Sequence, residues 1–425
     1  MIKNIFSRNK IEILPIKTMG NKIVFQVKNG MRRLKKVYGN IGEKEIHMLM
    51  FDDIPLINFH GENYFCPTCE KMISAGYGLD KCSEIKPFME KIRQTLNISF
   101  DCMEKSFEAL KPFFGLLESG YYLLSEEELF PTNGDEEFFW KIGSEPKSNQ
   151  ATYMKYDSGD FRLGTAKAKY MLPTQPPERF NRQCAEEYRT RKDTRALAYS
   201  TEGNLCAVLD GHHKATAAAI DGKSMKTLLI SPMTAVAQTM EGKGKWKRTL
   251  YFNEFKLPEE ELPIKLPEDN KIFPSNRLKE DELKRLMLLK EKSFDKYEWP
   301  QEILDTAKQY YSSEVLAYIE WAGDLSDGRL NGILEGKCVE NESTLIYIAE
   351  ALYATKNPRF TEFTISVCKN EIYRPKIKEL YELLAKVKTQ EVEDFFVEYL
   401  VDIENNRQDI KKIIDDYFAE YELCN

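Results

Sequence analysis

Long apolar runs are missing from this sequence, and so are the features of a secreted chain. No stretch of the 425 residues approaches the roughly 20 apolar residues that a membrane-spanning helix needs. The first ten residues carry charges but no apolar core followed by small residues, so we expect no signal peptide. The sequence therefore predicts a cytoplasmic protein with no membrane partner.

Basic charge is not in excess either. The formal net charge of −7 argues against a protein that coats nucleic acid non-specifically. One local basic segment, residues 242–248, leaves contact with phosphates or single-stranded nucleic acid open, but a glycine-lysine hairpin loop is the preferred interpretation of it. Nucleic acid is therefore not the favoured partner.

Cysteine is present, but not as a disulfide framework, because nine cysteines cannot pair fully and a reducing compartment keeps them as thiols. Cys66 and Cys69 have the Cys-x-x-Cys spacing of a zinc knuckle, and Cys82 follows at a usual distance for the second half of such a site. His60 is preferred over Cys102 as the fourth ligand. We expect a structural zinc here; a redox-active pair and unliganded cysteines in a turn are the alternatives.

Histidine is scarce, and two of the four histidines are adjacent, at positions 212 and 213. The five apolar residues 205–209 lead into Asp210-Gly211, and an alanine-rich segment continues to Ile220. This pattern predicts a strand, a tight turn and a helix. The first amide groups of a helix have no partners within it, so the turn is a candidate anion site, with phosphate as the expected ligand, at Gly211, His212, His213 and Lys214. An ordinary strand-to-helix connection capped by Asp210 is the alternative.

The length of the chain predicts several domains of an α+β protein. We expect an N-terminal α/β region with the zinc site over residues 1–145 and a nucleotide-binding domain over 150–255. A Pro/Glu linker over 256–275 and an all-helical domain over 276–425 should follow. In the helical domain, residues 351–363 can be laid over residues 383–395, which favours stacked helical pairs as in a HEAT-like solenoid, with a simple bundle as the alternative.

The order of expected elements around the turn is strand or loop, helix, hairpin, helix and strand. With the motif Asp210-Gly-His-His-Lys214, the segment from about Tyr170 to Ile230 resembles the ParB N-terminal/sulfiredoxin-like superfamily, including its free-serine kinases. The resemblance covers roughly 60 residues and implies a fold that grips nucleotide phosphates at the start of a helix. Lys214 stands where the family usually has Arg, which keeps the charge but loses the bidentate fork.

This resemblance also implies a choice of chemistry. A sulfiredoxin-like activity needs a cysteine in the turn, where this chain has His212. A kinase-like member could use Asp210 and Glu178 as its catalytic carboxylates, with ATP or CTP and Mg²⁺ as cofactors. The hypothesis is thus a bacterial-type nucleotide-phosphate-binding protein, as a phosphotransferase or a nucleotide hydrolase. The alternative is an inactive regulatory or scaffold protein that binds protein or DNA through its helical and zinc regions.

Overall fold

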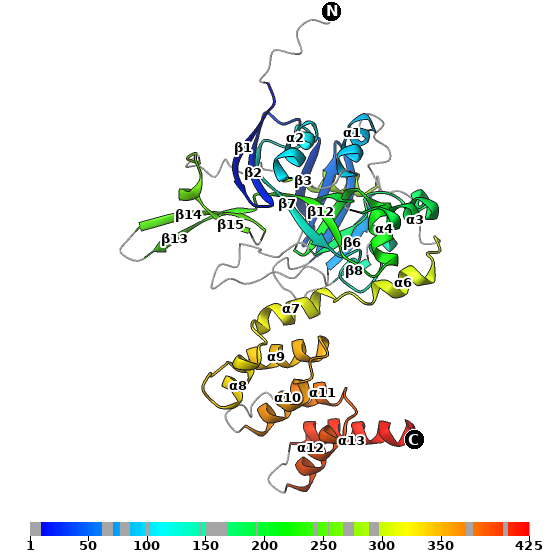
Figure 1. The fold of residues 1–425 in the computed structure, drawn as a ribbon, viewed down its shortest axis with the longest axis vertical. Helices are drawn as coiled ribbons and strands as arrows, with labels where there is room; N and C mark the ends of the chain where they lie inside the picture. The colour runs from blue at the N-terminus through cyan, green and yellow to red at the C-terminus, as the bar shows by residue number, and fades with distance from the viewer. Residues whose placement is uncertain are drawn as a thin grey trace, which may run out of the picture. The chain divides into compact units, whose positions relative to one another are not determined.

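The computed structural model describes fourteen ranges of the chain, and every statement below concerns these residues: 10–61, 71–76, 86–97, 102–143, 147–149, 169–192, 194–201, 203–241, 245–253, 255–266, 276–288, 297–370, 377–402 and 407–424. The chain divides into two compact units, unit 1 (Met1–Ser313) and unit 2 (Glu314–Asn425). Helices and three sheets confirm the mixed α/β class (Figure 1). In the described part of the chain, no helix is long and apolar enough to cross a bilayer.

The largest sheet of unit 1 is mixed and carries the segment that the sequence singled out. Its strands run in the order β1 (Glu12–Met19), β2 (Lys22–Lys28), β7 (Gly120–Leu129), β12 (Met225–Pro232), β10 (Ala196–Ser200), β11 (Leu205–Asp210) and β9 (Tyr170–Leu172). The β10–β11 hairpin is antiparallel, whereas β12 runs parallel to β10 and β9 runs parallel to β11. The expected order of strand, helix, hairpin, helix and strand is thus observed.

Helices cover both faces of this sheet. In unit 1 the helices are α1 (Lys86–Leu96), α2 (Met103–Phe114), α3 (Arg182–Thr190), α4 (His212–Ile220), α5 (Glu280–Leu288) and α6 (Gln301–Ala307). Phe107 and Phe114 of α2 pack on Phe25 of β2, with ring centroids 5.3 and 4.5 Å apart. Ala215 of α4 lies in the same core cluster as Ala198 of β10. The strand register places the side chain of Ala198 on the face of the sheet opposite to that of Phe25.

Two smaller sheets lie in the described part of unit 1. One has the order β3 (Leu34–Ile41), β4 (Lys44–Phe51), β5 (Ile54–Gly61), β6 (Lys71–Ala75) and β8 (Lys147–Asn149), and the other is β13 (Ala235–Glu241), β14 (Lys245–Phe252) and β15 (Phe255–Pro258). The short β-rich runs of the first 60 residues could form one small sheet by themselves. They divide instead, because β2 pairs with the distant β7 while β3, β4 and β5 pair with one another.

Unit 2 is helical. Its helices are α7 (Ser313–Ala322), α8 (Asp327–Leu334), α9 (Glu342–Ala354), α10 (Phe360–Lys369), α11 (Ile377–Leu384), α12 (Gln390–Val401) and α13 (Gln408–Cys424). α10 packs against α8, α9, α11 and α12, and α11 packs against α9 and α13. The two stretches that overlay in sequence occupy equivalent places, since one joins α9 to α10 and the other joins α11 to α12.

Candidate functional site

The turn between β11 and α4 has a backbone that only glycine adopts easily. Gly211 has φ +109°, and a Cβ atom at this position would lie 2.8 Å from Cβ of Ala196. Both the left-handed backbone and the close approach of β10 therefore require glycine. The strand before it and the helix after it begin and end where the apolar run and the alanine-rich segment predict.

Gly211 is also the N-cap of α4, so the helix begins without a side chain that could cap it. Its carbonyl accepts the first intrahelical hydrogen bond, from the amide of Ala215 at 2.8 Å. The amides of His212, His213 and Lys214 come before this bond and must find acceptors outside the helix. Together with the positive end of the helix dipole they favour an anion.

A cavity of about 360 Å³ lies at this helix start, which is within the range typical of small-molecule sites. Residues from four parts of unit 1 line it: Arg93, Gln175, Arg179, Cys184, Tyr188, Asp210, Gly211, His212, His213 and Lys214. All five residues of the Asp-Gly-His-His-Lys motif are therefore brought together. Glu178, the second predicted carboxylate, is exposed in the short 3-10 helix Pro177–Arg179 and is not among the lining residues.

The two histidines hold the loop before α3 against α4. Nε2 of His212 accepts a hydrogen bond from the amide of Thr174, and Nε2 of His213 accepts one from the amide of Asn181, both at 3.0 Å. Burial lowers the pKa of His212 to about 3 and also lowers the pKa of His213. Both rings are therefore neutral at physiological pH, and they offer an anion their backbone amides rather than a positive charge.

Lys214 brings a cation to the wall of the cavity although its side chain is 4% exposed. Its Nζ donates a hydrogen bond to the carbonyl of Arg195 at 2.9 Å and lies 5.5 Å from the centre of the Tyr188 ring. Burial lowers the pKa of Lys214 to about 8, while the carboxylate of Asp210 opposes this shift. The ammonium is thus still the main form at neutral pH.

Arg93 reaches the site from α1, 117 residues before its partner in the sequence. Its Nε donates a hydrogen bond to Oδ1 of Asp210 at 3.1 Å, and the Arg93 side chain is half exposed while that of Asp210 is buried. α1 is held in place where the amide of Arg195 donates to the carbonyl of Leu96 at 3.1 Å. The carboxylate of Asp210 therefore serves first as the counter-ion of a cation at the mouth of the cavity.

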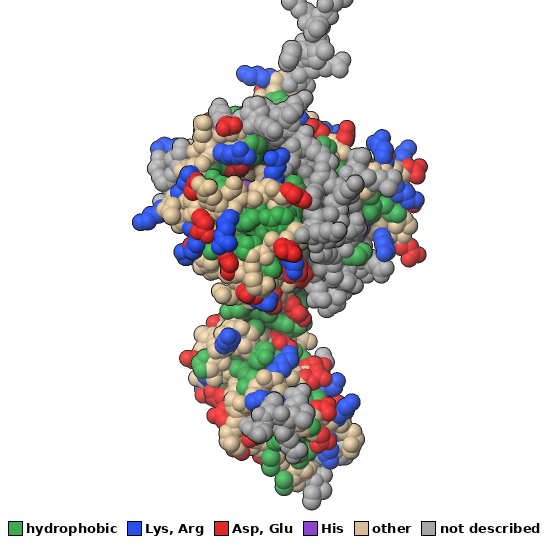
Figure 2. Space-filling view, turned by 90° about the vertical axis from the view of Figure 1, so that its right-hand side faces the viewer, with side chains coloured by type: hydrophobic (Ala, Val, Ile, Leu, Met, Phe, Trp, Pro, Cys, Tyr) green, Lys and Arg blue, Asp and Glu red, His purple; other side chains and the backbone are tan. Residues whose placement is uncertain are grey.

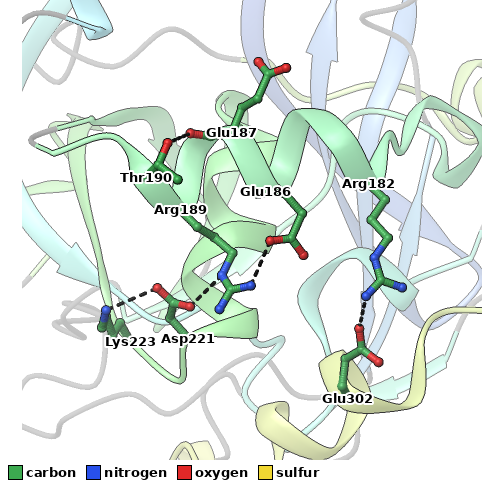
Figure 3. A network of polar contacts seen from close by, with 8 residues as sticks. All are labelled: Arg182, Glu186, Glu187, Arg189, Thr190, Asp221, Lys223 and Glu302. Atoms are coloured by element: carbon green, nitrogen blue, oxygen red, sulfur yellow. Dashed lines mark hydrogen bonds and ion pairs between the residues drawn. The ribbon is translucent and has the colours of Figure 1, made fainter.

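α3 forms a further wall, with Cys184 and Tyr188 facing the cavity, and ion pairs hold both of its ends (Figure 3). Arg182 at its start pairs with Glu302 of α6 at 2.6 Å. Arg189 near its end pairs with Asp221, directly after α4, at 2.7 Å (Figure 3). The geometry of the cavity thus depends on contacts outside it.

Sequence reasoning missed five of the lining residues: Arg93, Gln175, Arg179, Cys184 and Tyr188. Arg93 lies beside the apolar stripe of α1, where a solvated cation is ordinary, and α3 was expected only as a helix. Neither element carries a local signal that it faces the start of α4. Only the tertiary packing brings them together.

The predicted metal chemistry needs correction. Among the described residues, no group of three or more His, Cys, Asp or Glu side chains could hold a metal ion. His60 lies in β5, where it pairs with Met72 of β6, and Asp210 pairs with Arg93. The cofactor prediction of a structural zinc and of ATP or CTP with Mg²⁺ is therefore contradicted. Three of the predicted zinc ligands, Cys66, Cys69 and Cys82, lie outside the described residues.

The cavity thus combines a helix start, three basic side chains and one carboxylate that is already paired. This arrangement can hold an anion without a metal, because amides and cations supply the hydrogen bonds and the charge. Comparisons of the chain with families of known proteins, with curated proteins and with solved structures find no match.

Proposed function

We propose that unit 1 binds a small phosphorylated molecule through its phosphate group, in the cavity at the start of α4 and without a metal ion. The observation that supports this proposal best is the convergence of the uncapped helix start with Arg93, Arg179 and Lys214 around one cavity. The resemblance to the ParB/sulfiredoxin-like superfamily points in the same direction, since its members bind nucleotide phosphates at the same turn.

Binding is favoured over phosphoryl transfer. A kinase-like reaction needs a carboxylate within reach of the substrate hydroxyl and a divalent cation on the phosphates. Here Asp210 is paired with Arg93, Glu178 does not line the cavity, and the described residues hold no metal site. A protein that responds to a bound phosphate, rather than one that transfers it, is therefore the function that we propose.

The surface offers weaker support for an extended nucleic-acid partner. On the face drawn in Figure 2, Lys and Arg side chains are interspersed with Asp and Glu side chains on each unit. Lys247 and Arg248 of the basic segment lie in β14 and pair with Glu260 and Glu259 at 3.2 and 3.4 Å. The described part of that segment is thus neutralised by its neighbours.

The test uses the full chain and methyl phosphate as the probe, in the presence of a chelator. We expect calorimetry to detect binding, and we expect the double substitution Arg93→Gln with Arg179→Gln to weaken it about tenfold or more. Arg277→Gln is the matched control, because Arg277 is an exposed arginine that donates a hydrogen bond to Asn40 and does not line the cavity.

Cys184 reports the place of binding, since its partly exposed thiol lines the cavity. Methyl phosphate should slow the alkylation of Cys184 by N-ethylmaleimide, as measured by peptide mass spectrometry, and leave the rate at the exposed Cys338 of unit 2 unchanged. Binding without protection of Cys184 would place the phosphate elsewhere, and no binding at all would overturn the proposed function.

A further inference from the structure

The side chains that line the cavity carry a definite excess of positive charge. Arg93, Arg179 and Lys214 contribute three positive charges and Asp210 one negative charge, so the difference is two (3 − 1). The histidines add none, because the pKa of His212 and that of His213 are both lowered. The start of α4 adds roughly half a positive charge from the helix dipole. An occupant with two negative charges would balance the lining.

Resting on the proposed phosphate-binding function, we infer that the ligand is a phosphomonoester bound as its dianion, and that phosphodiesters and carboxylates are selected against. A terminal phosphate presents two negative charges to the lining, whereas a phosphodiester or a carboxylate presents one. A dianion gains more Coulomb energy from these cations than a monoanion does, because the attraction scales with the charge of the ligand.

The hydrogen-bond donors of the site match the same group. A phosphomonoester has three terminal oxygens and a phosphodiester has two. The site presents the amides of His212, His213 and Lys214 at the start of the helix, together with the ammonium of Lys214. An ammonium group has three N–H donors, and among the described residues the carbonyl of Arg195 takes one of them. The donors are thus sufficient for all three terminal oxygens.

The charged groups around Lys214 do not alter this balance. On its amino-terminal side, β11 presents Asp210 and α1 presents Arg93, and these two pair with each other. Arg191, directly after α3, lies 3.9 Å from Glu187, and Arg195, before β10, lies 3.9 Å from Glu126. Cys184 and Tyr188 of α3 are neutral at physiological pH, because burial raises the pKa of each.

The affinity for a phosphomonoester should therefore fall at both acidic and alkaline pH. Below about pH 6 a phosphomonoester gains a proton and becomes a monoanion. Above about pH 8 the free protein loses the proton of Lys214, because burial lowers the pKa of this lysine to about 8. Affinity for a phosphomonoester should be highest between these limits. A phosphodiester has no second ionisation, so its weak binding should fall only on the alkaline side.

The experiment compares methyl phosphate with dimethyl phosphate and acetate on the full chain by calorimetry. Near pH 7 we expect methyl phosphate to bind about tenfold more tightly or more than either of the others. Equal affinity for the two phosphates, with Cys184 protected by both, would overturn the dianion inference and leave the proposed function standing. Failure of both phosphates to bind would overturn the proposed function as well.

Substitutions at Lys214 separate charge from folding. Lys214→Met keeps the apolar stem and should reduce the preference for methyl phosphate over dimethyl phosphate and abolish the alkaline fall in affinity. Lys214→Arg keeps the charge and should restore the preference while it removes the alkaline fall, because Arg does not titrate there. Lys226→Met, at an exposed position of β12, is the control and should change neither property. A preference that survives Lys214→Met would contradict the inference.

Discussion

The two units of this protein differ most in what their interiors contain. Among the described residues, unit 1 buries Asp210, Lys214, Arg195, Glu118 and His212, whereas the core of unit 2 is built from apolar and aromatic side chains with Thr364 as its buried polar residue. Burying a charge is costly unless a partner or a hydrogen bond compensates it. A unit that buries several charges beside a cavity is therefore where ligand binding is expected, and a unit that buries almost none is expected to give stability and shape.

The polar interior of unit 1 is highly organised. Oε1 of Glu118 accepts a hydrogen bond from Arg32 at 3.1 Å and its Oε2 accepts one from Asn276 at 2.7 Å. Asn276 also lies along the edge of β3, where the amide of Tyr38 donates a hydrogen bond to the backbone carbonyl of Asn276 at 3.1 Å. This cluster is fully engaged in structural contacts. The lining of the cavity differs from it, because its residues surround a volume of about 360 Å³ at the start of α4.

The largest loss of stability is expected from a substitution in the apolar core of unit 2, and it would test whether the two units differ in function. Phe363 of α10 is fully buried in the apolar core. Phe363→Ala should lower the free energy of unfolding by about 4 kcal/mol, through lost burial and the cavity that it leaves. Urea unfolding of the full chain would measure this change. Affinity for methyl phosphate should stay within error below the transition, and a large loss of affinity would show that the units are not independent in function.

A slightly smaller effect is expected at the turn of unit 1. Gly211→Ala places a Cβ 2.8 Å from Ala196 on a backbone with φ +109°, so it should destabilise unit 1 by about 3 kcal/mol through strain and overlap. Gly20→Ala is the matched control, since Gly20 also has positive φ but has nothing within 4 Å of the added atom, and it should cost about 1 kcal/mol. Equal losses in urea unfolding would mean that the approach to Ala196 is not tight.

The sequence predicted the core of this site because its signals are local. An apolar run, Asp210-Gly211 and an alanine-rich segment determine a strand, a turn and a helix within sixteen residues, and β11 and α4 follow them. Residues 129–140, in contrast, carry a turn signal followed by aromatic residues, a local pattern that is typical of a turn and a strand. The turn is observed, but Phe139–Lys141 form a 3-10 helix, and Nε1 of Trp140 donates to the carbonyl of Gln175.

The rest could not be predicted, because it depends on contacts between distant segments. Arg93 joins the site through a helix whose own pattern shows only an apolar stripe and a solvated face. The alternating charges of the basic stretch at residues 31–37 are typical of an exposed strand edge. The structure instead pairs that edge of β3 with Asn276 and Leu278, which lie about 240 residues away. Neither the contact of Arg93 with Asp210 nor the pairing of β3 with Asn276 and Leu278 can be recognised from the local sequence.

Acid should destabilise unit 1 through a histidine, and unit 2 contains no histidine. Burial lowers the pKa of His212 from 6.5 to about 3, so the unfolded chain binds a proton below pH 6.5 that the folded chain does not. Stability is therefore complete above pH 6.5 and falls as the pH falls toward 3. Between pH 7 and pH 5 the loss should be about 2 kcal/mol.

Urea unfolding at the two pH values would measure this loss. His212→Gln, which keeps an acceptor for the amide of Thr174, should flatten the dependence on pH even though it lowers stability overall. If the free energy of unfolding of that variant depended on pH as in the unchanged protein, groups other than His212 would cause the acid sensitivity. The predicted difference in acid stability between the two units would then be wrong.

The smallest effects should come from the surface, where the two units are alike. Arg189 joins α3 to Asp221, and in unit 2 Arg359 pairs with Asp327 of α8 and Glu362 of α10 at 2.8 and 2.7 Å. Replacing either arginine with Gln should cost less than about 1 kcal/mol, because exposed ion pairs are screened by water and salt. Their effects on binding should differ, since α3 carries Cys184 to the cavity. Arg189→Gln should change the alkylation rate of Cys184, and Arg359→Gln should not; equal rates in both variants would show that α3 holds its place without this ion pair.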